Sequence, residues 1–326
     1  MKKLFVLSTI VTLSFSLIAC SKEKPTDLKG QDESNEKLTT LNIGYQKAAL
    51  KFIVAKQNKT FEQAFPGVKI QWKEFPAGPQ TLEALNVGAI DVGYTGDTPV
   101  IFALSAGKPI QYLAYENGSK NSHSLLLPKD STIQSLKDLK GKRIGVTQGS
   151  SAHYFLSQIL DQAQLSWSDI QPVWLTPADA RAAIDKKSLD AWAIWDPYAS
   201  AASLKGDTRV LIDSKALPLA YSFYLSSPKF LKQHAVEAQK FVQTLNQVDD
   251  WINQHPDQAA KILAQSTSLD ENITKLVLEK RNIPAYAKLV DTDTVTAQQK
   301  IADLFYQLKL IPNAVSLKDH VWTGQD

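Results

Sequence analysis

Two short segments carry side chains suited to holding a small anion. Gly149-Ser150-Ser151 precedes an apolar pattern of helical spacing, so Ser150 is expected at the N-cap of a helix. A helix start presents free backbone N–H groups and about half a positive charge, and serine hydroxyls add further donors. Ser150 could instead simply cap its own helix. A second helix start follows Gly96-Asp97-Thr98, with Pro99 at the first helical position.

Aromatic residues surround the Asp196-Pro197 dipeptide at the end of an expected strand. Trp195 and Tyr198 flank Asp196, and an aromatic face with a polar edge suits a ligand that has an apolar part. Core packing is an equal alternative for Trp195 and Tyr198. For Trp192 packing is the expectation, because strand alternation places it opposite the neighbours of Trp195.

Residue sets for catalysis or metal binding are poorly represented. The segment 149–153 lacks the last glycine of a nucleophile elbow. The five histidines share no metal-ligand spacing. Asp291-Thr292-Asp293 lacks the glycine and the closing glutamate of a calcium loop. No motif calls for a cofactor, so the glycine-, hydroxyl- and aromatic-rich loops indicate a binding cleft rather than an active site.

The elements that would hold these loops alternate along the chain. From Leu41 onward, short apolar runs alternate with helical patterns, which is typical of βαβ units and a mostly parallel sheet flanked by helices. In open α/β sheets, ligands bind at the carboxyl ends of the strands. The sequence therefore predicts an α/β fold with its cleft at these loops. The expected strands cover 41–45, 68–75, 91–94, 110–115, 124–127, 143–147, 173–175, 191–194 and 209–212.

Helical spacing is clearest in two segments. After Ser150, apolar residues recur three and four positions apart over 152–163, as on one buried face. After Ser227 the pattern is helical to the end of the chain. A second buried face in that region is predicted from Ile301, Leu304, Phe305 and Leu308.

The N-terminus has the order of a secretory signal. A basic pair, Lys2-Lys3, precedes an apolar run and the small residues before Cys20, the only cysteine of the sequence. Leu17-Ile18-Ala19-Cys20 resembles the bacterial lipoprotein box, which implies cleavage of a signal peptide over 1–19 and lipidation of Cys20. We therefore expect an exported protein, anchored to a membrane and facing the periplasm or the cell exterior. An ordinary signal peptide with an incidental cysteine is the alternative.

Composition limits the remaining possibilities. Residues 20–40 form a polar stretch that cannot bury enough apolar surface to fold, so we interpret them as the lipid anchor and a flexible stalk. The rest is long enough for two lobes, and its hydrophobic content allows it to fold without a disulfide. The charge of +3 becomes 3 − 2 = +1 once Lys2 and Lys3 are removed, and the basic residues are scattered. Nothing here favours a nucleic-acid partner.

A family resemblance covers the chain from Leu41 to Trp322. The sequence resembles the aliphatic sulfonate-binding proteins of ABC importers, relatives of the taurine- and nitrate-binding proteins. Six motifs in order carry the resemblance: Ile43-Gly44-Tyr45-Gln46-Lys47, Tyr94-Thr95-Gly96-Asp97-Thr98-Pro99, Gly149-Ser150-Ser151-Ala152-His153, Ala191-Trp192-Ala193-Ile194-Trp195-Asp196-Pro197-Tyr198, Tyr221-Ser222-Phe223-Tyr224 and Gln298-Gln299-Lys300-Ile301-Ala302-Asp303-Leu304-Phe305.

The resemblance implies a two-lobed periplasmic-binding-protein fold of the second type that closes over its ligand. Lobe one would comprise 41–125 and 225–326, lobe two 126–224, with crossings near 124–128 and 222–226. A monomer that delivers an alkanesulfonate to ABC permease subunits is implied. Asp97 either orients amide donors and itself faces away from the sulfonate, or it contacts a ligand amine. The ligand-binding residues we expect are Gln46, Gly96, Asp97, Thr98, Gly149, Ser150, Ser151, Trp195, Asp196 and Tyr198.

Three alternatives remain. The same transport role could serve taurine, nitrate, bicarbonate or a thiamine precursor. Two-lobed folds of this kind also host enzymes that make small metabolites, but an enzyme needs a nucleophile, a base or a cofactor lysine in the cleft. A purely structural lipoprotein is a third alternative, which the glycine-rich loops disfavour.

Overall fold

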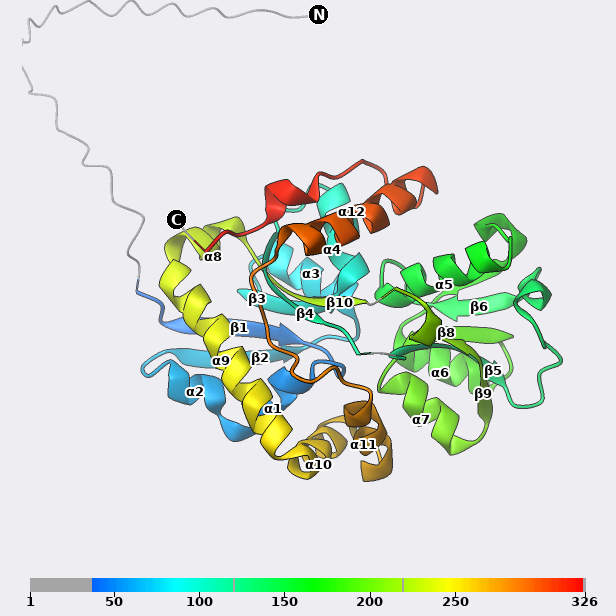
Figure 1. Ribbon diagram of the computed structural model, residues 1–326, viewed down its shortest axis with the longest axis horizontal. Coiled ribbons are helices and arrows are strands. Elements are labelled where there is room, and N and C mark those ends of the chain that lie inside the picture. The colour runs from blue at the N-terminus through cyan, green and yellow to red at the C-terminus, as the bar shows by residue number, and fades with distance from the viewer. Residues whose placement is uncertain (1–36, 120, 219, 325–326) are drawn as a thin grey trace, which may run out of the picture. The chain divides into compact units, whose positions relative to one another are not determined.

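The computed structural model describes residues 37–119, 121–218 and 220–324 (Figure 1). The expected signal peptide over 1–19, the lipidation site Cys20 and most of the expected stalk over 20–40 lie outside these residues. Within them, no helix combines the length and the apolar character needed to cross a membrane.

The first sheet is mostly parallel, with one reversed strand. Its order is β2-β1-β3-β10-β4, with β1 parallel to β2 and β3, and β10 antiparallel to both β3 and β4. Its strands are β1 (Thr40–Tyr45), β2 (Lys69–Glu74), β3 (Val92–Gly96), β4 (Gln111–Asn117) and β10 (Tyr221–Ser226).

The second sheet repeats this arrangement. Its order is β7-β6-β8-β5-β9, with β6 parallel to β7 and β8, and β5 antiparallel to β8 and β9. Two mostly parallel sheets therefore agree with the predicted fold class. The strands are β5 (His123–Pro128), β6 (Arg143–Val146), β7 (Gln171–Trp174), β8 (Ala191–Trp195) and β9 (Thr208–Asp213).

Helices flank each sheet (Figure 1). Those that follow the strands of the first sheet are α1 (Leu50–Asn58), α2 (Thr60–Ala64), α3 (Gly78–Asn86) and α4 (Asp97–Ser105). Those of the second sheet are α5 (Ser151–Gln162), α6 (Pro177–Asp185) and α7 (Tyr198–Lys205). The C-terminal part holds α8 (Pro228–Gln233), α9 (Ala235–Gln254), α10 (Pro256–Thr267), α11 (Glu271–Glu279) and α12 (Thr292–Gln307).

The first sheet buries both of its faces. Along β10, Tyr224 belongs to the apolar cluster that includes α1 and α9, whereas Phe223 and Leu225 belong to the cluster that includes α4 and α12. The Phe52 ring centroid of α1 lies 5.5 Å from that of Tyr224. Each large apolar side chain buried in this way contributes about 1.5–3 kcal/mol. A third cluster, which includes Trp192, packs α5, α6 and α7 on the second sheet.

Every expected strand is present, and the helix after Ser150 is confirmed as α5. In α12, Ile301 and Phe305 are buried as predicted, but Leu308 is 43% exposed because it lies just past the end of the helix. The crossings lie a few residues earlier than expected. Residues 124–128 belong to β5 and 222–226 to β10, so the chain passes between the sheets over 118–122 and 214–220.

Candidate functional site

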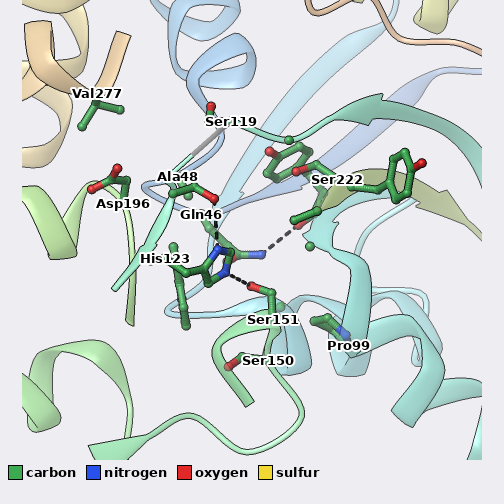
Figure 2. Close-up of a pocket in the computed structure, with 18 residues that line it drawn as sticks. Gln46, Ala48, Pro99, Ser119, His123, Ser150, Ser151, Asp196, Ser222 and Val277 are labelled. Carbon is green, nitrogen blue, oxygen red and sulfur yellow. Dashed lines mark hydrogen bonds between the residues drawn. The ribbon is translucent and has the colours of Figure 1, made fainter. Parts of the chain in front are cut away.

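A cavity of about 120 Å³ lies where the loops of the two sheets meet (Figure 2). Six of the residues expected at the site line it: Gln46, Gly96, Ser150, Ser151, Trp195 and Asp196. The four others, Asp97, Thr98, Gly149 and Tyr198, do not. The remaining lining residues are Ala48, Gly78, Tyr94, Pro99, Gly118, Ser119, Ser122, His123, Ala220, Tyr221, Ser222 and Val277.

Helix α5 begins at this cavity. Ser150 precedes it in an extended conformation, but its hydroxyl makes no capping bond and instead donates to the Thr147 carbonyl oxygen at 2.7 Å. The backbone N–H groups of Ser151 and Ala152 donate to no acceptor in the described part of the chain. The start of α5 therefore keeps two amide donors for a ligand.

Gly149 shapes this helix start without reaching the cavity. Its φ of 71° lies in the left-handed region, where glycine is favoured. Its N–H group donates to Nδ1 of His153 at 3.2 Å, one turn into α5. Gly149 thus acts through the loop conformation that presents Ser150 and Ser151.

Ser151 meets a histidine from the second sheet. Its hydroxyl lies 2.8 Å from Nε2 of His123, the first residue of β5, and Figure 2 shows the two side chains facing each other. Nδ1 of His123 lies 3.0 Å from the Ser122 hydroxyl. Burial lowers the pKa of His123 to about 4, so the ring is neutral near pH 7.

Asp97 is turned away from the cavity and folds over the start of its own helix. Its carboxylate accepts the Thr98 hydroxyl at 2.8 Å. Burial raises the pKa of the Asp97 carboxyl to about 6. Because an acidic side chain lies in the first turn of α4, this helix start is a poorer anion site than expected from Thr98-Pro99. Asp97 lines a neighbouring cavity of about 230 Å³ instead.

Of the two aromatic residues at and just after the end of β8, Trp195 lines the cavity and Tyr198 does not. Trp195 packs edge-on against Tyr198, with ring centroids 6.1 Å apart. Burial raises the pKa of Tyr198 to about 12. Trp192 is 1% exposed, which confirms its predicted place in the core.

The Asp196 carboxylate is satisfied within the protein. One oxygen accepts the backbone N–H group and the hydroxyl of Ser200, at 2.9 and 2.7 Å. The other accepts Nζ of Lys280 at 2.8 Å, and Lys280 directly follows α11. A carboxylate of the lining that is paired with a cation repels a bound anion less than an unpaired one would.

Sequence reasoning missed several lining residues. Ser122 directly precedes β5 and His123 is its first residue; both lie just before the crossing expected over 124–128, and no motif marked them. Val277 lies in α11, and no sequence motif near it indicates that it lines the cavity. Ser222 belongs to the Tyr221-Ser222-Phe223-Tyr224 motif, which had not been assigned to the site.

Among the residues that the structure describes, no lysine or arginine lines the cavity. Its donors are neutral: serine hydroxyls, the α5 amides and the side-chain amide of Gln46, which is oriented by a 2.9 Å bond from Nε2 to the Tyr94 carbonyl oxygen. Trp195, Ala48 and Val277 add apolar surface. Such a lining suits a small ligand with an anionic head, whose charge is spread over several oxygens, and an apolar tail.

Two mostly parallel sheets, linked by two crossings, with a cavity where their loops meet, define the periplasmic-binding-protein fold. The sequence model of the family described as NMT1/THI5 like matches residues 46–259. The chain belongs to this family.

Three relatives are similar over most of their length. An Escherichia coli K12 protein provisionally named as aliphatic sulfonates-binding is 41% identical over 282 residues, 86% of this chain and 88% of its own. The alkanesulfonate-binding protein SsuA of Xanthomonas axonopodis pv. citri bound to MOPS is 41% identical, with a TM-score of 0.85 over 88% of this chain and 99% of that one. The periplasmic aliphatic sulphonate binding protein SsuA from Escherichia coli is 40% identical, with a TM-score of 0.79 over 88% and 98%.

A more distant likeness concerns the fold alone. A cysteine-to-serine mutant of the desulfurization enzyme DszB, in complex with biphenyl-2-sulfinic acid, is 16% identical with a TM-score of 0.66.

Proposed function

We propose that this protein is the substrate-binding component of an ABC importer and captures aliphatic sulfonates for delivery to the permease. One observation carries the proposal: a cavity with neutral donors at the start of α5 in a chain 41% identical to an alkanesulfonate-binding protein. The relatives at 40–41% identity are named as binding proteins, which supports a binding protein rather than an enzyme.

The lining suggests how such a ligand would lie. The sulfonate head belongs at the start of α5, where Ser151 and the free amides can donate to its three oxygens. Leaving those oxygens without partners would cost several kcal/mol. The tail would lie against Trp195, Ala48 and Val277. An adjoining cavity of about 80 Å³ shares Ala48, Tyr94 and Val277, but Lys51, Glu116 and Arg281 also line it, so it suits a polar extension of the ligand better than a longer alkyl tail.

Titration calorimetry with a panel of small anions tests the assignment. Methane-, ethane- and butanesulfonate, taurine, sulfate, nitrate and a pyrimidine thiamine precursor are titrated into the purified protein in buffers free of sulfonate groups. We expect saturable binding of alkanesulfonates, one per chain. Binding of nitrate or the pyrimidine without any response to sulfonates would contradict the proposal and favour one of the alternative ligands.

One observation favours a second candidate, a small-metabolite enzyme. The 2.8 Å contact of Ser151 Oγ with His123 Nε2 is within the range of a serine nucleophile and its base. The partner of Nδ1, however, is the Ser122 hydroxyl rather than a carboxylate. Mass spectrometry of the ligands after long incubation separates the candidates: a binding protein returns them unchanged, whereas an enzyme converts them.

We also propose the cellular setting and the lobe division. Cleavage before Cys20 and its lipidation would tether the protein outside the cell membrane, with residues to about 40 as a stalk and the folded part as a monomer. Lobe one would hold 41–125 and 225–326 and lobe two 126–224. The change of sheet between β4 and β5, and again between β9 and β10, supports this division to within a few residues.

Cys20→Ser tests the anchor. The variant should fold normally but leave the membrane fraction, or keep its signal peptide. A variant that partitions like the wild type and loses no acyl label would contradict lipidation.

A further inference from the structure

The hydrogen-bonded chain Ser122–His123–Ser151 lies along the cavity, and all three residues line it. The backbone holds the ring firmly. His123 pairs with Trp195 in the ladder between β5 and β8, and the backbone N–H group of His123 donates to the Ser214 hydroxyl at 3.2 Å. The imidazole also packs on Phe155, with centroids 5.7 Å apart. Both serine hydroxyls are therefore tied to one fixed ring.

Proton counting gives this chain a definite behaviour. A neutral imidazole has one N–H group, so one ring nitrogen donates and the other accepts. The serine that accepts from the ring N–H can donate its own hydroxyl proton to a ligand, whereas the other serine donates its hydroxyl proton to the ring nitrogen that has no hydrogen. When the imidazole carries a second proton, both nitrogens donate, and the hydroxyl protons of Ser122 and Ser151 are both free.

We propose that His123 takes up a proton together with the anion and so turns both serine hydroxyls into donors toward it. His123 is thus a positioning residue that acts through Ser122 and Ser151. This inference rests on the proposed function of the site. It also places a positive charge beside a cavity that, within residues 37–119, 121–218 and 220–324, no lysine or arginine lines.

The direction of the pH effect follows from burial. In the free protein, burial holds the pKa of His123 down at about 4. A bound anion stabilises the charged ring and raises that pKa. Affinity should therefore be constant at high pH and should rise as the pH falls below the pKa of the complex, by up to about tenfold per unit.

Other ionisable groups face the same space. Tyr94, Tyr221 and Asp196 share the cavity lining, and the Asp196 carboxylate is paired with Lys280. The neighbouring cavity, which His123 and Ser151 also line, adds Asp97, Tyr154 and Lys300. Asp97 is the main alternative source of a pH effect. Its pKa of about 6 lies within the mildly acidic range where we expect affinity to change, and its protonation would also favour an anion.

The experiment is calorimetric titration of ethanesulfonate across mildly acidic to mildly alkaline pH, in acetate, bis-tris and Tris. Comparison of buffers with different ionisation heats gives the number of protons taken up. In the wild type we expect the affinity to rise at least tenfold toward acid pH, with net proton uptake. His123→Gln should give a flat profile, whereas Asp97→Asn should keep the slope.

The reverse pattern would overturn the inference: a slope that survives in His123→Gln and disappears in Asp97→Asn. A flat wild-type profile without proton uptake would overturn it as well. If His123→Gln does not fold, NMR titration of the His123 imidazole in the wild type decides, since its pKa must rise when ethanesulfonate is added. Sulfonate binding without that rise refutes only the role of His123, whereas no sulfonate binding at any pH refutes the proposed function too.

Discussion

Two adjacent serines at the start of α5 have opposite uses. The Ser150 hydroxyl is spent inside the protein on the Thr147 carbonyl oxygen, whereas the Ser151 hydroxyl faces His123 at the cavity. Ser151→Ala should weaken sulfonate binding by about 1.5–3 kcal/mol, the usual value of a hydrogen bond to a charged group. Ser150→Ala, the matched control, should lower the free energy of unfolding by about 0.5–1.5 kcal/mol and change affinity less.

Calorimetry and urea unfolding of the two variants check this pair. If Ser150→Ala weakens binding as much as Ser151→Ala while both unfold like the wild type, both hydroxyls bind the ligand and the assignment of Ser150 to the loop is wrong.

Asp97 contributes to stability with an unusual sign. Its pKa of about 6 in the folded protein lies above the ordinary value of 3.8, so ionisation is less favourable in the folded chain than in the unfolded one. The stability that Asp97 contributes is therefore fully present at low pH, and it is lost as the pH rises from the ordinary pKa of 3.8 to the folded-state pKa of about 6. Asp97→Asn lacks it, so its stability relative to the wild type should improve by about 2–3 kcal/mol over that interval.

Urea unfolding of both proteins on either side of the interval measures the difference. If the free energies of unfolding of Asp97→Asn and the wild type differ by the same amount at both pH values, the prediction of a raised Asp97 pKa is wrong.

At the scale of elements, Lys280 joins α11 to the loop after β8. Its Nζ reaches Asp196 at 2.8 Å and the Ser200 hydroxyl at 2.9 Å, in a poorly exposed position. Lys280→Gln leaves a nearly buried carboxylate without its cation, so it should loosen this contact, enlarge the radius of gyration and weaken sulfonate binding about tenfold.

The same helix supplies the control. Lys275 forms an exposed ion pair with Asp257 at 3.4 Å, and such pairs contribute about 0–1 kcal/mol. Lys275→Gln should match the wild type in scattering and in affinity. If Lys280→Gln gives the same scattering and affinity as Lys275→Gln, then the Lys280 contact does not hold α11 to the loop after β8.

The elements also show what local sequence can predict. The apolar runs gave the expected strands, and the helical spacing after Ser150 gave α5. β10 was not predicted as a strand, because its partners β3 and β4 lie more than 100 residues away and no local pattern identifies them.

The same limit applies to the site. Loops at strand ends predicted Gln46, Gly96, Ser151 and Trp195 at the cavity lining. His123 was missed because its partner Ser151 comes from another element, 28 positions along the chain. A helix was expected to start at Pro99, but α4 begins two residues earlier, at Asp97, and sequence could not show that the Asp97 carboxylate accepts the Thr98 hydroxyl.

At the scale of the whole folded part, the cavity draws residues from both sheets and both crossings. Gln46 and Gly96 come from the first sheet, His123 and Trp195 from the second, and Ser119 from a crossing. A ligand that contacts both sheets favours whichever arrangement brings them together, by its difference in affinity for the two states. This arrangement explains how one small anion could report its presence to a permease.

A crystal structure of the protein with ethanesulfonate tests the central claim most directly. We predict the sulfonate group at the start of α5, with its oxygens at hydrogen-bonding distance from the Ser151 hydroxyl and the amides of Ser151 and Ala152, and the ethyl group against Trp195. A sulfonate bound elsewhere, or one in this cavity with its oxygens turned away from α5, would contradict the account.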